Sequence, residues 1–444
     1  MRRFLRRFLR RFAGPSALAT LLVGCSGSPS VASGSPDHPR ASGAACVAGW
    51  STVHVPKPSK STAGLARLGV ADVPSGLNAM AAVSSSDIWA VGAFTKDSTS
   101  LQVTALTEHW DGTRWSVVRA PHDAASTPSG PPGALLSGVA ATSSHDVWAV
   151  GAVARATRDD NGNEVDLDQT LAEHWDGRRW SAVPAADDSQ DDALVGVSAR
   201  SSSDVWAVGT SNHTVGPNAS FVTPLVEHWD GTRWSLVHAP TPGLDPANAA
   251  AVASVFGGQN SGEGKPYDEA SFSAVHALAA DDVWAVGMIT RHDDTGTAPT
   301  QTFTEHWNGT AWRVVNAPDV HVGQLQHGAD DSLYAVTATR ADDVWAVGAA
   351  SPEGTLTLHW DGTSWSVIPS AHGGSDSYLG DVAAISATNV WAVGNAIEHW
   401  DGRQWTQTAT IGGKTFEPLA AIAAVSADDI WMVSEDDFLH YTCR

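Results

Sequence analysis

The sequence is poor in basic residues, in cysteine and in long apolar runs, and each shortage excludes a class of protein. Its 444 residues include 26 Lys and Arg against 48 Asp and Glu, a net charge of −22. Because so acidic a surface repels phosphate backbones, we expect no binding to nucleic acid. The chain has 3 cysteines, and no cluster of His and Cys has the spacing of a metal site. After Gly24, no apolar run is long enough to predict a transmembrane helix.

The first 24 residues have the pattern of an export signal. Six arginines lie between Arg2 and Arg11, and the mostly apolar stretch 13–24 is too short for a stable membrane anchor. The residues Leu22-Val23-Gly24-Cys25 resemble the bacterial lipobox, in which small residues precede a lipidated cysteine. The resemblance implies a lipoprotein signal peptide over 1–24, with lipid on Cys25 and an extracytoplasmic protein attached to the bacterial membrane through that lipid alone. An ordinary signal peptide is the alternative, and the paired arginines leave general and twin-arginine export open.

Residues 25–45 are rich in Ser, Gly, Pro and Ala without any apolar period, which predicts a flexible tether. Loss of the signal peptide would remove six basic residues and no acid, so the net charge would fall to about −28. The third and largest region, residues 46–444, has a repetitive pattern that predicts its architecture.

Two short phrases recur along residues 46–444. The first is Asp-Val-Trp-Ala-Val-Gly, and its copies, three of them altered, are Asp87–Gly92, Asp146–Gly151, Asp204–Gly209, Asp282–Gly287, Asp343–Gly348, Asn389–Gly394 and Asp429–Ser434. The second is Glu-His-Trp-Asp-Gly-x-x-Trp, found with small changes at Glu108–Trp115, Glu173–Trp180, Glu227–Trp234, Glu305–Trp312, Leu358–Trp365 and Glu398–Trp405, and cut short at Leu439–Tyr441. Seven copies of one unit predict a repeat architecture.

Each unit predicts four strands. Apolar residues recur ten, seven and five positions before the first phrase in every copy and indicate the first strand. The first phrase itself, bounded by a Ser/Asp turn and by Gly, predicts a second strand that is buried on both faces. The third strand ends at Glu-His-Trp, and Asp-Gly supplies a hairpin turn because both residues tolerate positive φ. The fourth strand begins with the last Trp of the second phrase.

Seven units of four antiparallel strands resemble a β-propeller, an all-β ring of seven blades. Radial closure would bury the apolar faces and edges that an open stack of sheets leaves exposed. The two phrases are similar to the Trp-rich repeats of secreted bacterial propellers. The Trp-Asp pair also resembles WD40 repeats, but the Gly-His dipeptide of that family is missing, so no WD40 residue role is carried over. The resemblance covers residues 46–444 as one domain.

The two ends of the repeat region are expected to complete one blade together. The seventh copy stops after its third strand, and Cys46–Val53 aligns with the fourth strand of the first copy, Asp111–Val118. In this alignment Cys46 and Cys443 take the positions of two adjacent turn residues, which predicts a disulfide between them. With Cys25 assigned to lipid, two cysteines remain, and an even number is expected of a disulfide-bonded protein in an oxidising compartment. Two free thiols are the alternative.

The repeated Trp and His residues favour a structural role. Tryptophan also suits sugar-binding platforms, but its even distribution over all copies indicates packing between blades. One histidine per copy cannot converge with the others on a single ion, so we expect each to hydrogen-bond the Asp of the first phrase. The histidines of this set are His109, His174, His228, His306, His359, His399 and His440.

Function is expected where the repeat is broken. The resemblance to propellers implies ligand binding at the central channel or on the face that carries two sets of loops, those before the first strand and those after the second. These loops are long in copies 1–4 and short in copies 6 and 7. The loops of copies 2–4 are acidic and form the predicted binding rim: Asp187, Asp188, Asp191, Asp192, Tyr267, Asp268 and Glu269.

One segment of this rim has oxygen donors at alternate positions, as in sites for hard cations. The possible Ca²⁺ ligands are Asp159, Asn161, Asn163 and Asp166. An EF-hand loop would need Gly where Glu164 stands, so a solvated acidic loop is the alternative. No other cofactor is predicted.

The sequence predicts no catalytic residues. It has no Gly-x-Ser-x-Gly motif, and its Asp-Gly-x-x-Trp turns lack the Ser of sialidase Asp boxes. We therefore expect a monomeric binding or scaffolding module for a protein or glycan of the cell envelope. The alternatives are a carbohydrate-active propeller, either lectin or glycoside hydrolase, and a structural envelope protein without a specific ligand.

Overall fold

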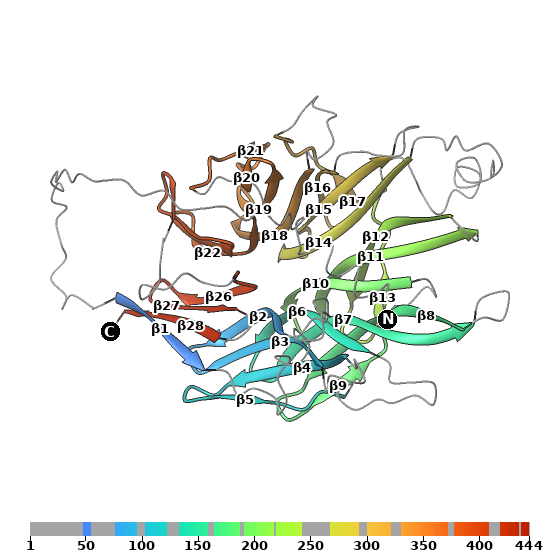
Figure 1. Cartoon of the computed structure of the whole chain (residues 1–444), viewed down its shortest axis with the longest axis horizontal. Coiled ribbons are helices and arrows are strands. Elements are labelled where there is room, and N and C mark those ends of the chain that lie inside the picture. The colour runs from blue at the N-terminus through green and yellow to red at the C-terminus, as the bar shows by residue number, and fades with distance from the viewer. Residues whose placement is uncertain are drawn as a thin grey trace, which may run out of the picture.

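The computed structural model is a ring of seven antiparallel sheets, each of four strands (Figure 1). It describes residues 48–54, 76–95, 103–121, 133–158, 164–186, 191–216, 219–241, 267–292, 300–320, 330–371, 377–407, 418–434 and 437–443. In this part of the chain the regular structure is β-strand throughout, which confirms the predicted seven-bladed β-propeller. Among the same residues, no helix has the length and apolarity needed to cross a membrane.

In blades 1 to 6, four consecutive strands run from the centre of the ring outward. Blade 1 comprises β2 (Gly76–Ser84), β3 (Asp87–Thr95), β4 (Val103–Trp110) and β5 (Trp115–Val117). Blade 2 comprises β6 (Ala134–Ser143), β7 (Asp146–Arg158), β8 (Glu164–Trp175) and β9 (Trp180–Val183). Blade 3 comprises β10 (Asp191–Ser201), β11 (Asp204–Gly216), β12 (Ala219–Trp229) and β13 (Trp234–Leu236).

The remaining blades follow the same order, apart from the last. Blade 4 comprises β14 (Tyr267–Ala279), β15 (Asp282–His292), β16 (Thr300–Trp307) and β17 (Trp312–Val314). Blade 5 comprises β18 (Asp330–Arg340), β19 (Asp343–Ser351), β20 (Gly354–Trp360) and β21 (Trp365–Val367). Blade 6 comprises β22 (Leu379–Ser386), β23 (Asn389–Gly394), β24 (Ile397–Trp400) and β25 (Trp405–Gln407). Blade 7 comprises β26 (Ala421–Ser426), β27 (Asp429–Val433), β28 (Asp437–Cys443) and, outermost, β1 (Ala48–His54).

Blade 7 closes the ring with strands from both ends of the described chain. β1 pairs with β28 so that Trp50 lies opposite Tyr441, as Trp115 lies opposite Trp110 in blade 1. Trp50 also contacts Trp391 of blade 6, with ring centroids 6.0 Å apart. The predicted closure is therefore confirmed.

The predicted disulfide and signal peptide lie outside the described residues, as do Cys25 and Cys46. The backbone of Cys443 pairs with Ala48 at the start of β1. Cys443 therefore lies opposite a residue that is only two positions after Cys46 in the sequence. The disulfide between Cys46 and Cys443 stays a prediction.

The second strand of each blade forms the core, because it is paired on both edges and buried on both faces. In β3, Ile88, Trp89, Ala90 and Val91 are all buried. Trp89 reaches into blade 2, where its ring lies 4.8 Å from that of Trp175 and 5.2 Å from that of Trp180. The same contacts recur around the ring, so the tryptophans are wedges between blades, as predicted.

The glycine of the first phrase has a different role from the expected one. It was expected to end the second strand, and in blade 6 β23 does end at Gly394, but in blades 1–5 the strand runs on, as β3 does past Gly92 to Thr95. A bulge in β2, between Leu77 and Ala79, brings the backbone of β2 against Gly92. A Cβ atom there would lie 2.0 Å from the carbonyl oxygen of Gly76, so the position admits only glycine.

Candidate functional site

The histidine of each blade is part of a structural clasp. In blade 1, His109 Nε2 lies 2.8 Å from Asp87 Oδ1, and the imidazole stacks on Trp89. Equivalent pairs with distances of 2.7–2.9 Å join His174 to Asp146, His228 to Asp204, His306 to Asp282, His359 to Asp343 and His440 to Asp429. Blade 6 uses Asn389 in place of aspartate, as partner of His399. The expected hydrogen bonds are therefore confirmed.

The turn between the third and fourth strands is held by its aspartate side chain. Asp111 Oδ1 accepts the backbone N–H groups of Thr113 and Arg114 and the hydroxyl of Thr113. These bonds lower the pKa of Asp111 to about 2. Gly112 takes the positive φ, at 89°. The predicted turn is thus present, but the aspartate acts through its carboxylate and only the glycine supplies the left-handed backbone.

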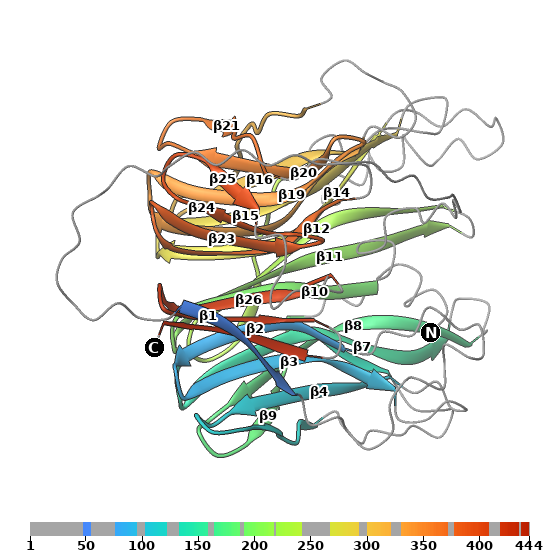
Figure 2. The same ribbon diagram turned by 60° about the vertical axis from the view of Figure 1, so that its left-hand side comes forward.

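The two faces of the ring differ in regularity. One face carries the repeated turns, and there the indole N–H of the third-strand tryptophan in blades 1–4 and 6 donates to a carbonyl of the adjacent turn, as Trp110 does to Ser85. We call this the turn face. The opposite face, the hairpin face, carries strands of very different length: β7 and β11 have 13 residues each, whereas β23 has 6 and β24 has 4. Figure 2 shows the hairpins β7–β8 and β11–β12 reaching to the right beyond the rest of the ring.

Two of the predicted rim residues serve the fold itself. Asp191 accepts the backbone N–H of Asp168 at 2.9 Å and the side-chain amide of Asn212 at 3.1 Å. It therefore links β10 to β8 of the neighbouring blade and to β11. Asp192 is fully buried at the next position of β10. Neither carboxylate is presented as an exposed binding group.

The other predicted rim residues are partly described. Asp268 and Glu269 are half-buried at the start of β14, where their backbones pair with Arg291 and Thr290. Tyr267 opens the same strand, opposite His292. Asp187 and Asp188 lie outside the described residues.

The predicted calcium ligands are also largely outside the described chain, since Asp159, Asn161 and Asn163 are not described. Asp166 belongs to β8, where its backbone pairs with Ala156. Within the residues that the structure describes, no group of three or more His, Cys, Asp or Glu side chains could hold a metal ion.

Buried glutamates of the second phrase join neighbouring blades. Glu227 accepts the backbone N–H of Ala186 at 2.8 Å, and Glu398 accepts that of Ala371 at 2.9 Å. Each bond links a third strand to the chain that enters its blade. For Glu305 the corresponding position is Pro240, which has no N–H to donate.

Glu305 is consequently a buried carboxyl group without a hydrogen-bond partner in the described chain. Its side chain is 0% exposed, and burial raises its pKa to about 9. Glu108 in blade 1 is in the same state, with its pKa raised by burial to about 8. Both carboxyl groups are therefore protonated at neutral pH.

The innermost strands carry two titratable groups that the sequence reasoning missed. Asp381 of β22 accepts the backbone N–H groups of Val382 and of Ile422 in the next blade, and burial raises its pKa to about 6. His276 of β14 has its pKa lowered to about 4 by burial. Both stand at positions where the other copies of the repeat have small residues. This departure from the repeat could have revealed them from the sequence.

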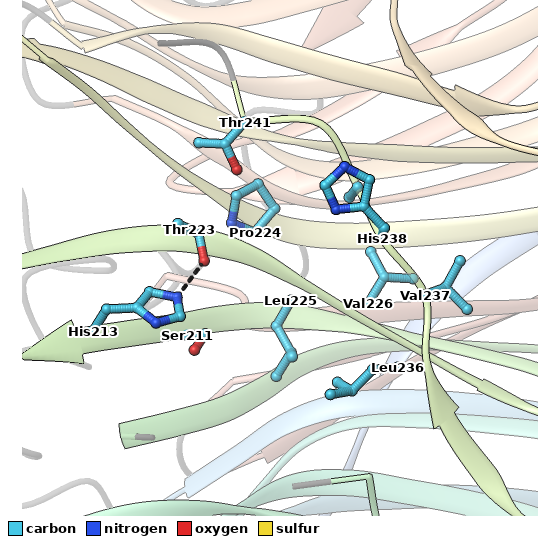
Figure 3. Close-up of a pocket in the computed structure, with 11 residues that line it drawn as sticks. Ser211, His213, Thr223, Pro224, Leu225, Val226, Leu236, Val237, His238 and Thr241 are labelled. Carbon is cyan, nitrogen blue, oxygen red and sulfur yellow. Dashed lines mark hydrogen bonds between the residues drawn. The ribbon is translucent and has the colours of Figure 1, made fainter. Parts of the chain in front are cut away.

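A pocket opens at the outer edge of blade 3 (Figure 3), with a volume of about 110 Å³. Ser211, His213 and Thr223 form the wall contributed by β11 and β12. His213 Nε2 lies 2.8 Å from Thr223 Oγ1, and the imidazole stacks on Phe221. The chain after β13 forms the other side and includes His238 and Thr241. This pocket was not predicted, because it depends on how that chain segment leaves the blade.

No protein-family model and no curated protein matches the sequence. Among solved structures, the chain is similar to YCF48 from Cyanidioschyzon merolae, with 14% identity, 89% of this chain and 98% of that chain covered, and a TM-score of 0.50. It is also similar to YCF48 bound to a D1 peptide, at 13% identity, coverage of 89% and 97%, and a TM-score of 0.49. A third structure is the SapL1 lectin in complex with alpha methyl fucoside, at 13% identity, coverage of 76% and 96%, and a TM-score of 0.39. Identities this low show the β-propeller fold alone.

Proposed function

We propose that the protein is an extracytoplasmic, lipid-anchored propeller that binds a protein of the cell envelope through the hairpin face of blades 2–4. The observation that carries the proposal is the inequality of the seven blades. Their cores and turn-face contacts repeat closely, yet the strands of blades 2–4 extend on one face well beyond those of blade 6. Extra strand length outside the shared core adds surface that closure of the ring does not need.

The charge of the chain favours a basic partner. The whole sequence carries a net charge of −22, and Asp268 and Glu269 stand half-buried where β14 begins on the hairpin face. Opposite charge on the partner would speed association and favour one docking orientation. A glycan partner, as in a lectin, is the competing outcome of the experiment below.

The experiment shortens one long hairpin to the length that the chain itself uses elsewhere. In blade 6, Asn395 alone joins Gly394 to Ala396, so replacing residues 210–224 of blade 3 by a single Asn copies that connection between Gly209 and Leu225. The matched control replaces residues 349–355 of blade 5 by Asn in the same way. Envelope extract is passed over the immobilised wild type and both variants.

We expect the blade 3 variant to capture at least tenfold less of one protein than the wild type does. The blade 5 variant should capture that protein as the wild type does. Equal capture by all three proteins would contradict the proposal. Capture of glycan in place of protein, measured on a glycan array, would favour the lectin alternative.

Calcium at the segment 159–168 remains a proposal of the sequence. If the ion binds there, adding Ca²⁺ should raise the melting temperature of the wild type, and Asp160→Ala should abolish that rise with the fold intact. A wild-type melting temperature that is the same with Ca²⁺ and with a chelator would dismiss the site.

A further inference from the structure

The chain that leaves the outermost strand is fastened to the third strand in blades 4 and 5. In blade 4, Asp319 Oδ1 accepts the backbone N–H of Thr302 at 2.8 Å and the hydroxyl of Thr302 at 2.9 Å. In blade 5, the hydroxyl of Ser370 donates to the carbonyl oxygen of Thr355 at 3.2 Å. These contacts hold the departing chain against the outer edge of β16 and of β20.

Blade 3 has a proline at the position of Thr302 and Thr355. The carbonyl oxygen of Val226 accepts the N–H of Val237, so the backbone groups of Val226 point to the outer edge of β12. Because alternate residues of a strand point the same way, those of Pro224 also face this edge. Pro224 therefore places a residue without an N–H at the point where blade 4 has its donor.

The departing chain of blade 3 lacks the other half of the fastening as well. Thr241 stands where blade 4 has Asp319, and Ala239 stands where blade 5 has Ser370. In the described chain, Val237 makes the backbone hydrogen bond to β12, and no such bond joins residues 238–241 to Pro224. The pocket of about 110 Å³ lies at this unfastened place.

A buried hydroxyl group in the pocket has no partner within the described chain. Ser211 is 3% exposed, lines the pocket, and its Oγ makes no hydrogen bond. Figure 3 shows Ser211 beside His213 and below Thr223 on the wall of the pocket. Because a buried hydroxyl without a partner is unfavourable, this atom favours a ligand that brings a hydrogen-bonding group.

We propose that this pocket takes one small side chain of an extended, basic segment of the partner protein, which lies along the outer edge of β12. The assignment rests on the proposed function and names the site within it. The volume equals that of roughly three to four water molecules, which suits a side chain of the size of Thr or Val. An extended segment fits because, among the described strands, none pairs with this edge of β12 beyond the three-residue β13.

The charge of the segment follows from its surroundings. The described residues that line the pocket include no Asp, Glu, Lys or Arg, so the inserted side chain is uncharged. The protein as a whole carries a net charge of −22, so the residues that flank the inserted one are basic.

Two variants test the site. The double substitution Pro224→Thr with Thr241→Asp copies the fastening of blade 4 and should close the pocket. Leu236→Lys places a charge and a longer side chain at the pocket, at a residue that is 46% exposed and whose substitution leaves the core intact. Its matched control is Val314→Lys, at the equivalent position of blade 4, where the side chain is 43% exposed.

The probe is a phage-displayed library of random 12-residue peptides, selected on the immobilised wild type. Peptides that share a small residue between basic ones are expected. Their Kd should rise at least tenfold in the closed double variant and in Leu236→Lys, and should stay within twofold of wild type in Val314→Lys. Unchanged Kd in the closed variant, or a library without enrichment, overturns the proposal. The proposal is also overturned if methyl glycosides, tested as a panel, bind the wild type and do not bind the closed double variant.

The same variants separate this proposal from the proposed function. If the envelope partner is lost on replacing residues 210–224 but retained by the closed double variant, the hairpin face binds and the pocket does not. If both variants retain the partner, the proposed function fails together with the pocket.

Discussion

At the scale of single residues, the structure is marked by polar groups that the repeat places deep in the ring. The histidine clasp is satisfied in every blade, by Asp in six blades and by Asn389 in blade 6, and the repeat itself made that partnership predictable. The buried glutamates were not predictable in the same way. Whether a glutamate finds a donor depends on a residue far earlier in the chain, which is Ala186 for Glu227 and Pro240 for Glu305.

The protonated glutamates should make stability fall as pH rises. Glu305 has a pKa of about 9 in the folded protein against an ordinary value of 4.5, so between these values the folded state keeps a proton that the unfolded state has released. In this range, each such carboxyl group lowers the free energy of unfolding by up to about 1.4 kcal/mol for every unit by which the pH rises. Glu305→Gln should flatten the slope of unfolding free energy between pH 5 and 9, as measured by urea denaturation. The exposed Glu353→Gln is the control, and an unchanged slope in Glu305→Gln would refute the assignment.

The tryptophan wedges should dominate the stability of each joint between blades. Trp206 lies 5.1 Å from Trp307 and 5.5 Å from Trp312 of blade 4, between ring centroids. Trp206→Ala should lower the free energy of unfolding by about 3–5 kcal/mol, because it opens a cavity in that joint. Trp307→Ala, at a half-buried position, should cost clearly less in the same denaturation experiment. Equal costs would mean that the wedge position has no special role.

At the scale of strands, the second strand could be predicted from its apolar run, whereas the bulge opposite its glycine could not. The bulge is a property of two paired strands, and the sequence of either strand alone does not reveal it. Blade 7 illustrates the dependence, since Ser434 replaces the glycine there and the ladder between β26 and β27 ends at Ala421 and Val433, before it reaches that point.

Substitution of the bulge glycine should therefore be costly wherever the bulge is present. A Cβ at position 209 would lie 1.9 Å from the carbonyl oxygen of Ala193. Gly209→Ala should lower the free energy of unfolding by about 3 kcal/mol, since the backbone of β10 has to move. Ser434→Ala in blade 7 should cost about 1 kcal/mol, the worth of its hydrogen bonds with Asp437. Similar losses in thermal denaturation for the two variants would contradict the role of the bulge.

The candidate site was harder to predict than the strands for a related reason. The sequence correctly located the unequal blades, because strand and loop lengths can be counted between repeats. It could not tell that Asp191 is held by Asp168 and Asn212, nor that Pro224 leaves the departing chain unfastened. Both depend on contacts between segments that have no repeat pattern of their own.

At the scale of the whole molecule, stability depends on the outermost strand of blade 7. Deletion of residues 48–54 would leave the edge of β28 unpaired and would remove Trp50 from its contacts with Trp391 and Tyr441. We expect the truncated protein to melt at a lower temperature and to self-associate through that edge. A synthetic peptide of residues 46–54 should restore the melting temperature, and a Trp50→Ala peptide should restore less of it. Full stability without β1 would show that closure is dispensable.

The direction of β1 has a consequence for how the molecule is presented in its surroundings. Ala48 pairs with Cys443, beyond Tyr441, which stands where other blades have the tryptophan that precedes their turn. The chain therefore enters β1 from the turn face, and Figure 2 shows the C-terminus on the side away from the long hairpins. If Cys25 carries the proposed lipid, the attachment would reach the ring at its turn face, on the side away from the long hairpins. The hairpin face would then stay clear of the attachment and accessible to molecules that arrive from beyond the cell surface.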